Sequence, residues 1–263
     1  MKVGFVGLGN QGKGLALNLA QAGHDLMVFD IRREPTAELA SAGASIAESA
    51  RAVGAHAEIV EVCVLDDAQV ERVVLGPEGI LAGARPGAII AIHSTIHPAT
   101  VSKVAEAAEA QRVEIVDAPV SGGANGARNK SVSYMVGGHD AAVDRCIPLF
   151  ETSGRKITRT GPRGTGMKAK LAHQVIICIN LLAAHEGMRL GREAGLSQDV
   201  LEKIVRDGGA QSRIADHWSQ LSMRHLAPVL HKDLELCLDF ARQLGLSMPG
   251  AALTQQMIDK IVP

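Results

Sequence analysis

The sequence predicts a two-domain protein, with an α/β domain built on a parallel sheet over residues 1–162 and an all-α domain over residues 163–263. Three observations support this prediction. Short apolar runs alternate with helical segments in the first half, a glycine-rich turn follows the first run, and the pattern becomes wholly helical after about residue 162. A chain of 263 residues suits one large or two medium domains with ample core.

Five apolar runs are the strand candidates, and the middle three are apolar enough to be covered on both faces. Strands and helices that alternate this often predict a parallel sheet with right-handed crossovers. The candidate strands span residues 2–8, 25–30, 58–65, 88–94 and 113–119. The first helix is expected over 12–23, with Leu15 and Leu19 on one face and Gly23 as its stop.

The second half predicts helices only. Apolar residues recur every three or four positions from Met167 to Ala194, which indicates one long helix. The segments 197–209 and 232–250 each end in glycine, a common helix stop, and another helix is expected from about Ala251. Glycines and a proline in 160–166 place the domain boundary there.

Charge and cysteine content exclude several classes of protein. Lys and Arg together number 27 and Asp and Glu 28, so no strong field favours nucleic acid or an anionic membrane. The N-terminus does not resemble a signal peptide, and no stretch is expected to be long enough to span a membrane. Four separated cysteines without Cys-x-x-Cys spacing indicate buried thiols in a reducing compartment. With no His-Glu-x-x-His motif either, we expect a cytoplasmic protein without a metal site.

The turn after the first run, Gly7-Leu8-Gly9-Asn10-Gln11-Gly12, has the spacing of a dinucleotide-binding loop. Gly7 permits a tight turn, Gly9 allows close approach of a pyrophosphate, and Gly12 allows close packing of the helix whose N-terminus faces the anion. The alternative for the glycines alone is an ordinary strand–helix turn. Asp30, 18 residues beyond Gly12, ends the second run where a carboxylate would accept hydrogen bonds from the adenine ribose. The glycine loop and the correctly spaced Asp30 together predict a Rossmann-type domain, with Ile31 beside the cofactor.

The choice between NAD and NADP depends on three residues. Asp30 favours NAD, because a 2′-phosphate would meet its negative charge. Arg32 and Arg33 favour NADP, since either could pair with that phosphate. We predict NAD, because the carboxylate lies at the strand end where the ribose is read; Arg32 is then a neighbour of the ribose.

A second glycine-rich segment, 117–127, follows the fifth run. Ser121, Gly122 and Gly123 offer a hydroxyl and backbone N–H groups that would suit a carboxylate. The residues alone fit an ordinary glycine-rich turn equally well. The segment is therefore a candidate anion site with an open alternative.

Five motifs occur in the order and spacing of the β-hydroxyacid dehydrogenase family, which the chain resembles over nearly its whole length. They are the glycine loop 7–12, HSTIHP at 93–98, DAPVSGG at 117–123, the glycines and lysine of 161–170, and KDL at 232–234. The resemblance implies NAD(P)-dependent interconversion of a small 3-hydroxy acid and its oxo acid or semialdehyde, and homodimers formed through the long helix. It also implies that Ser121, Gly122 and Gly123 hold the substrate carboxylate and that Leu65, Thr95 and Lys232 contact the cofactor. Without it, Thr95 would be a turn residue and Lys232 a helix surface charge.

The stretch GMKAKLAHQ, 166–174, contains two lysines. In the family the catalytic lysine follows the glycine pair by a fixed step, which implies Lys170 as general acid and base. Helix geometry agrees, because positions two apart point about 200° away from one another and Lys168 then faces solvent. His173 and Gln174 lie on the side of Lys170. A lysine can act as a base only if its pKa falls well below about 10.4, which burial promotes.

Gln174 is expected to orient the substrate hydroxyl or Lys170. The pair His173–Gln174 is similar to that of threonate-type members and favours a polyhydroxylated acid; alternatively, His173 is a buried helix histidine satisfied by backbone. Two other functions stay open. One is an imine reductase on the same scaffold, although those relatives usually replace the lysine, and the other is a non-catalytic dinucleotide-binding sensor or scaffold.

Overall fold

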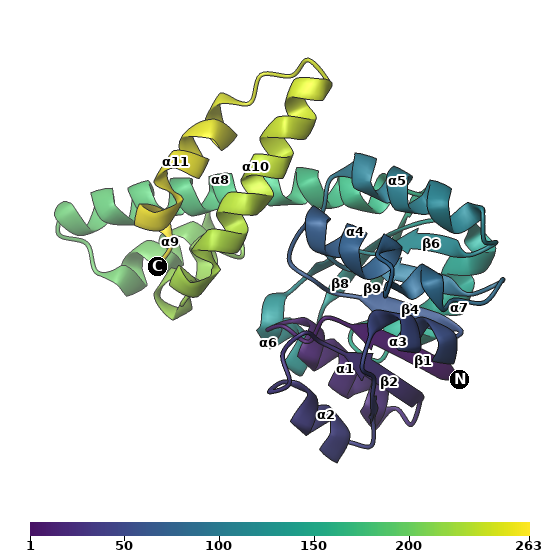
Figure 1. Ribbon diagram of the computed structural model, residues 1–263. Coiled ribbons are helices and arrows are strands. Elements are labelled where there is room, and N and C mark those ends of the chain that lie inside the picture. Colours follow the sequence, from purple (N-terminus) through teal and green to yellow (C-terminus); the bar gives the residue numbers. More distant parts are fainter. The chain divides into compact units, whose positions relative to one another are not determined.

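The structure is a computed structural model that describes residues 1–263. The chain forms two compact units, Met1–Lys170 and Leu171–Pro263 (Figure 1). The first unit is α/β and the second is helical, so the predicted fold class is confirmed.

One nine-stranded sheet forms the centre of the first unit. Its strands are β1 (Lys2–Val6), β2 (Asp25–Phe29), β3 (Ser45–Ile46), β4 (Ile59–Val62), β5 (Ile89–Ile92), β6 (Glu114–Asp117), β7 (Val120–Ser121), β8 (Ser133–Gly137) and β9 (Lys156–Gly161). Their order is β3-β2-β1-β4-β5-β6-β8-β7, and β9 pairs with β8. The five predicted runs are β1, β2, β4, β5 and β6, and these pair in parallel as expected.

The sequence did not predict the other four strands. Two of them, β3 and β7, have only two residues each. Strand β8 runs antiparallel to β6 and β7, so the sheet is mixed at this end. Strand β9 is largely exposed and carries no apolar run, which is why its sequence showed no strand signal.

Helices cover both faces of the sheet. They are α1 (Gly12–Gln21), α2 (Thr36–Ser41), α3 (Ala50–His56), α4 (Asp67–Leu75), the 3-10 turn η1 (Ile80–Ala82), α5 (Pro98–Glu109), α6 (Gly123–Arg128) and α7 (Asp140–Phe150). Alternate residues of β1 belong to separate cores, because successive strand side chains point to opposite faces. Phe5 packs with Leu15 and Phe150 in one core, whereas Val6 packs with Val53 in the other.

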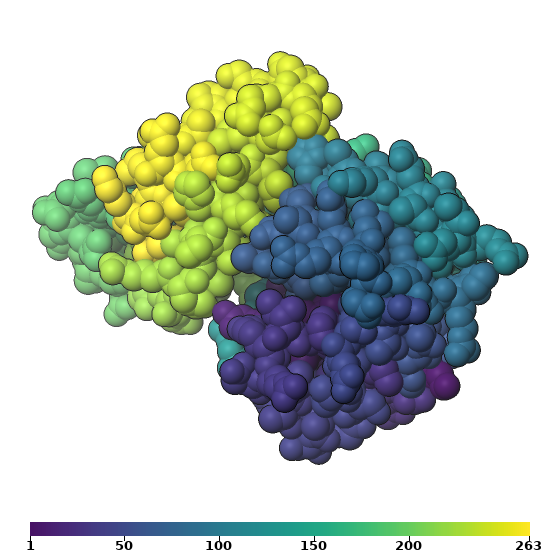
Figure 2. All heavy atoms as spheres, viewed as in Figure 1, coloured from purple at the N-terminus to yellow at the C-terminus, as the bar shows by residue number.

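The second unit consists of helices packed on one long helix. They are α8 (Thr165–Glu193), whose first residues, up to Lys170, belong to the first unit, α9 (Gln198–Asp207), the 3-10 turns η2 (Ala215–Gln220) and η3 (Arg224–Leu226), α10 (Ala227–Gln243) and α11 (Pro249–Ile261). The predicted long helix is α8. Helix α10 begins before the predicted start at residue 232 and ends at Gln243, before the predicted stop at Gly250, which lies in α11. Helices α10 and α11 pack side by side (Figures 1 and 2). The core includes Cys178, Leu181, Trp218 and Leu234.

Helix α8 corrects one expectation from the sequence. By length and composition it is apolar enough to cross a membrane, with a mean hydropathy of 1.3 over 18 residues. Of that window, 44% is buried inside the protein. Because Cys178 and Leu181 of α8 are core residues of the second unit, packing within the protein accounts for much of this apolar character.

Candidate active site

The residues of the first unit that are predicted to bind the cofactor gather at one edge of the sheet. Parallel strands present their carboxyl ends at the same edge, and there Gly7 follows β1, Asp30 follows β2, Leu65 follows β4 and Thr95 follows β5. Backbone hydrogen bonds continue the pairing into these turns. For example, the N–H of Gly7 donates to the carbonyl of Phe29 at 2.9 Å. The loops therefore form one continuous rim.

The glycine loop has the backbone that a dinucleotide requires. Gly7 has a φ of +96°, and a Cβ there would lie 2.5 Å from the carbonyl oxygen of Cys63. A Cβ on Gly12, the first residue of α1, would lie 2.1 Å from the carbonyl oxygen of Gly7. No atom lies within 4 Å of a Cβ built on Gly9. Gly7 and Gly12 are thus required by packing, whereas Gly9 leaves its outer side open for a ligand.

The carboxylate of Asp30 is held firmly at the end of β2. Its Oδ2 accepts from the backbone N–H of Leu8 at 2.7 Å, and Oδ1 accepts from the backbone N–H of Arg32 at 2.8 Å. The Arg32 guanidinium also lies beside it, with Nε 3.3 Å from Oδ1. The Asp30 side chain is only 7% exposed, whereas Ile31 is exposed. Asp30 therefore fastens the glycine loop to β2.

A cavity of about 290 Å³ opens beside this loop. It is lined by Leu8, Gly9, Asn10, Lys13, Arg32, Glu34 and Pro35. Close to it, the buried side-chain nitrogen of Gln11 has no hydrogen-bond partner in the protein. An open glycine backbone, two basic side chains and an unused amide donor at the start of α1 fit the pyrophosphate and ribose of a dinucleotide.

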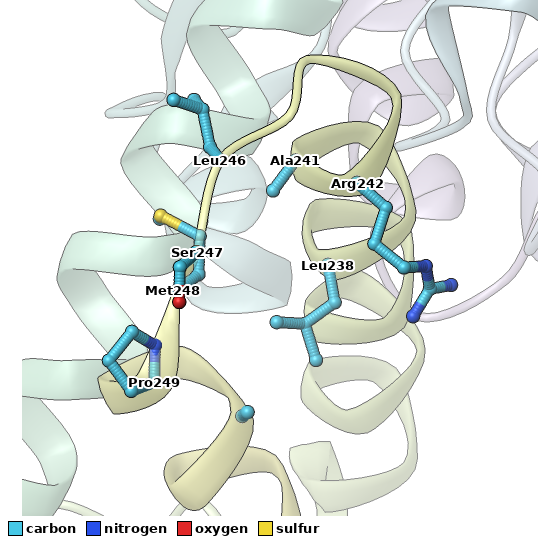
Figure 3. A pocket seen from close by; sticks show the side chains of 8 residues that line it. Leu238, Ala241, Arg242, Leu246, Ser247, Met248 and Pro249 are labelled. Atoms are coloured by element: carbon cyan, nitrogen blue, oxygen red, sulfur yellow. The ribbon is translucent and has the colours of Figure 1, made fainter.

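A second cavity, also of about 290 Å³, lies in the helical unit between α10 and the segment leading into α11 (Figure 3). Leu238 and Arg242 line it from α10, and Leu246 and Met248 from the segment. None of the predicted site residues lies among its lining residues.

The segment predicted to bind the substrate carboxylate joins β7 to α6. Ser121 ends β7, and Gly122 and Gly123 have φ angles of +132° and +60° that favour glycine. A Cβ on Gly123 would meet no atom within 4 Å, so its backbone is open on that side. The side-chain amide of Asn18, on α1, donates to the carbonyl of Ala127 at 2.8 Å. Helix α6 is thereby fastened to the helix that begins at the glycine loop.

Asp117, to which the sequence assigned no role, caps the start of α8. It lies at the end of β6 and is fully buried. Its carboxylate accepts from the backbone N–H groups of Gly164 at 2.6 Å and Met167 at 2.8 Å. Burial raises the pKa of Asp117 to about 6, although these backbone hydrogen bonds act in the opposite direction. The sequence signals were an acid at the end of a buried strand and its place as the first residue of the DAPVSGG motif.

The two lysines of α8 have opposite environments. Lys170 is 6% exposed, whereas Lys168 is exposed, as the family resemblance and helix geometry together predicted. Gln174, one helical turn beyond Lys170, is buried too. A buried lysine is costly unless its surroundings or its chemistry compensate, which marks Lys170 as a functional candidate.

Two predicted residues of the helical unit, Gln174 and Lys232, meet through one carboxylate that the sequence did not single out. Asp233 of α10 is 2% exposed, and its Oδ2 accepts from the amide nitrogen of Gln174 at 2.6 Å. The ammonium of Lys232 lies 2.9 Å from Oδ1. On the other side of Gln174, its Oε1 lies 3.1 Å from Nδ1 of His173. His173, Gln174, Asp233 and Lys232 thus form a connected polar chain.

The cysteines are free thiols, as the sequence predicted. Cys63 lies beneath the glycine loop, where burial raises the pKa of its thiol to about 12, with a further contribution from the negative charge of Glu61. A thiol with this pKa stays protonated at neutral pH and is a poor nucleophile.

Comparison with known proteins decides the family. Residues 2–161 match the family described as the NAD-binding domain of 6-phosphogluconate dehydrogenase, and residues 164–262 match the family described as NAD-binding of NADP-dependent 3-hydroxyisobutyrate dehydrogenase. The chain is 38% identical to the 2-hydroxy-3-oxopropionate reductase of Escherichia coli, covering 98% of this chain and 90% of that one. The chain belongs to the β-hydroxyacid dehydrogenase family. Like the family, it is an NAD(P)-dependent oxidoreductase that acts on the CH–OH group of hydroxy acids.

Other family members agree with this assignment. A 3-hydroxyisobutyrate dehydrogenase of Pseudomonas aeruginosa is 33% identical to this β-hydroxyacid dehydrogenase, covering 97% of this chain and 90% of that one. A solved 3-hydroxyisobutyrate dehydrogenase of Mycobacterium tuberculosis with L-serine superposes with a TM-score of 0.88, at 26% identity, covering 99% of this chain and 93% of that one. A Pseudomonas imine reductase has a TM-score of 0.68 at 20% identity, covering 97% of this chain and 91% of that one. That likeness concerns the fold alone.

Proposed function

We propose that this β-hydroxyacid dehydrogenase reversibly oxidises a small 3-hydroxy acid, with Lys170 as its general acid and base and NAD as its cofactor. The observation that carries the proposal is the burial of Lys170 one helical turn before the buried amide of Gln174. This places an amine and an amide on one helix face, out of bulk water. A carbinol needs both a proton acceptor and a group that orients it.

Bound nicotinamide supplies the hydride acceptor for oxidation and the hydride donor for reduction. The protein supplies the proton chemistry. The neutral Nζ of Lys170 accepts the hydroxyl proton during oxidation, and the ammonium returns it to the carbonyl oxygen during reduction. Gln174 orients the hydroxyl without adding charge, so it does not alter the proton balance.

The substrate carboxylate is held, in this proposal, by Ser121 with the backbone of Gly122 and Gly123. The positive φ angles of both glycines turn the chain there, and the backbone of Gly123 has an open side. A hydroxyl donor and exposed N–H groups suit an anion. The carboxylate would then fix which end of the substrate faces Lys170.

Cofactor binding is assigned to the rim of the sheet, with Gly7, Gly9 and Gly12 as the loop glycines and Leu65 and Thr95 on the neighbouring strand ends. Lys232 contributes from the helical unit. We propose NAD rather than NADP because Asp30 places a buried carboxylate at the ribose position. Arg32 is already paired with that carboxylate, so its charge is partly compensated there.

The substrate class proposed here is an acid with more than one hydroxyl group. The relatives act, by their names, on 2-hydroxy-3-oxopropionate, on L-serine and on 3-hydroxyisobutyrate. The first two carry a polar group on the carbon between the carboxylate and the reacting carbon. His173, joined to Gln174, adds a hydrogen-bonding group that an apolar substrate would leave unused.

A homodimer formed along α8 is also proposed. Ile176 is 62% exposed and Leu190 is 73% exposed. With the exposed residues Ala172, Ala183 and Gly187 they form one apolar stripe of small and branched side chains at helical spacing. Ile176→Glu should therefore lower the molecular mass measured by light scattering. A location in the cytoplasm is proposed because the four free cysteines suit a reducing compartment.

The decisive test is NADH formation with a panel of hydroxy acids. The panel contains 3-hydroxyisobutyrate, serine, glycerate and threonate, each with NAD or NADP, together with a cyclic imine in the reducing direction. We expect the highest kcat/KM with a polyhydroxylated acid and NAD. Turnover of the imine alone would support an imine reductase instead, and cofactor binding without any turnover would support a sensor or scaffold.

A further inference from the structure

Asp233 is a buried acid in the helical unit that takes no part in the proposed proton transfer. It lies on α10, and its partner Gln174 lies on α8, 59 residues earlier in the sequence. A carboxylate in such a place is costly unless it is paired and hydrogen-bonded. Its position therefore requires an explanation.

The packing of α8 and α10 makes this contact specific. Asp233 meets Gln174, and one turn further along α10 the thiol of Cys237 donates to the carbonyl of Leu171 at 3.3 Å. As residue numbers rise along α10 they fall along α8, so the two helices run in opposite directions here. Two side-chain contacts one turn apart hold the register between them.

The contacts of Asp233 determine which way the Gln174 amide faces. A carboxylate only accepts hydrogen bonds, so the Gln174 atom 2.6 Å from Oδ2 is the amide nitrogen. The amide oxygen must then face Nδ1 of His173, 3.1 Å away. That oxygen also only accepts, so Nδ1 carries a proton. Neutral His173 is consequently the Nδ1–H tautomer, with Nε2 an acceptor.

The second oxygen of Asp233 faces Lys232. The ammonium lies 2.9 Å from Oδ1, yet Oδ1 receives no aligned hydrogen bond, so the contact is an ion pair. Charge thus holds Lys232 against the same carboxylate that orients Gln174. The Asp233 side chain is 3% exposed and that of Lys232 is 21% exposed, which limits screening by water.

We infer that Asp233 is a positioning residue, whose single carboxylate fixes the Gln174 amide and holds Lys232, and so couples substrate recognition to cofactor recognition. This inference rests on the proposed function, which assigns Gln174 to the substrate and Lys232 to the cofactor. It adds that His173 presents Nε2 as an acceptor, which suits a hydroxyl donor on the substrate.

Asp233→Asn is the informative variant because it keeps the shape and removes the charge. The Asn oxygen will turn toward the Lys232 ammonium, which leaves the Asn amide nitrogen facing Gln174. The Gln174 amide must then rotate, and its nitrogen faces Nδ1 of His173. We expect His173 to change from the Nδ1–H to the Nε2–H tautomer, as read from long-range proton–nitrogen NMR spectra in which its signals are assigned with His173→Gln.

Kinetics of the full chain supply the second measurement. Loss of a charged hydrogen bond should lower kcat/KM for the hydroxy acid about 10- to 100-fold and weaken NADH binding about tenfold, measured by fluorescence titration. In a Gln174→Ala background, Asp233→Asn should have little further effect on kcat/KM for the hydroxy acid. In a Lys232→Ala background it should have little further effect on NADH binding. The matched control is Asp239→Asn on the same helix, an exposed acid paired with Arg242, which should leave every value unchanged.

The outcomes separate this inference from the proposed function. Should Gln174→Ala and Lys232→Ala leave the kinetic constants and NADH binding intact, the site assignment is wrong. Should those variants be impaired while Asp233→Asn keeps the wild-type tautomer and kinetics, the inference is wrong. If Asp233→Asn does not fold, Gln174→Asn tests the same contact, because the shorter side chain no longer reaches the carboxylate of Asp233. It should shift the His173 tautomer and raise the KM for substrate without changing NADH binding, and an unchanged tautomer there would also overturn the inference.

Discussion

The carboxylate of Asp117 accepts a hydrogen bond from the backbone N–H of Met167 at 2.8 Å, so the end of β6 caps the helix on which Lys170 lies. The same carboxylate accepts from Gly164. One turn of helix separates this cap from Lys170. The position of the lysine therefore depends on a strand end far away in the sequence.

Replacing Asp117 by alanine should reduce both stability and turnover. The change leaves two buried N–H groups without their acceptor, which should lower the free energy of unfolding by about 3 kcal/mol. Because the first turn of α8 is then loosened, kcat should fall at least about tenfold. Denaturant unfolding and steady-state kinetics measure the two effects. Asp140→Ala, an exposed acid in the first turn of α7, is the control and should change neither.

Asp117 should also give stability a pH dependence. Burial raises its pKa in the folded state to about 6 from an ordinary value of 3.8, so the folded state holds this proton more tightly than the unfolded state. The resulting stabilisation is complete below about pH 4 and is lost as pH rises through about 6. At 1.36 kcal/mol for each pH unit between these values, it amounts to about 3 kcal/mol.

The Asp117→Asn variant isolates this contribution because it lacks the titrating group. The difference in unfolding free energy, wild type minus variant, should grow as pH falls from about 7 to about 4. A difference that stays constant over this range would show that Asp117 does not titrate there.

Lys170→Ala should lower kcat by about 10²- to 10⁴-fold, since this is the usual contribution of general acid–base catalysis. NADH binding, measured by fluorescence, should change little. Lys168→Ala is the matched control, because it removes a lysine from the exposed side of the same helix. Equal activity of the two variants would contradict the assignment of Lys170.

Asp30→Ser should shift cofactor preference toward NADP. The substitution removes the negative charge that would face a 2′-phosphate and frees Arg32 from its ion pair. We expect the ratio of kcat/KM with NAD to that with NADP to fall at least about tenfold. Asp25→Ser, at the exposed start of the same strand, should leave the ratio unchanged. A wild-type enzyme that prefers NADP would contradict the proposed cofactor before any substitution is made.

Glu61 and His93 form a buried pair that should matter for stability. Nε2 of His93 lies 3.0 Å from a carboxylate oxygen of Glu61, and Nδ1 lies 2.8 Å from the carbonyl of Ala118. Glu61→Ala leaves the ring nitrogen without a partner and should cost about 3 to 5 kcal/mol of unfolding free energy. Glu61→Gln should cost less, because its amide can donate to Nε2 of a neutral histidine. Thermal and denaturant unfolding compare the two.

Local sequence patterns predicted much of the fold. The glycine loop and the five apolar runs specify the parallel strands, because each signal lies within a few residues of chain. The long helix α8 could be predicted for the same reason, because its apolar residues recur every three or four positions. Strands β3, β7 and β9 could not, since two-residue or exposed strands gain their identity from pairing rather than from composition.

The candidate site also has residues that the local sequence predicted and residues that it did not. Asp30 and the glycines could be assigned from spacing, and the family resemblance together with the periodicity of the helix separated Lys170 from Lys168. The roles of Asp117 and Asp233 could not be found in this way, because the hydrogen-bond partners Gly164 and Gln174 lie 47 and 59 residues away in the sequence.

By itself, the sequence determined the fold class and the dinucleotide loop, because each depends on neighbours within a turn or a strand, and the family resemblance added which lysine of α8 is the candidate base. Only the tertiary structure decided which buried carboxylate holds which helix. That choice depends on helix packing and on the high cost of leaving a buried charge without a partner.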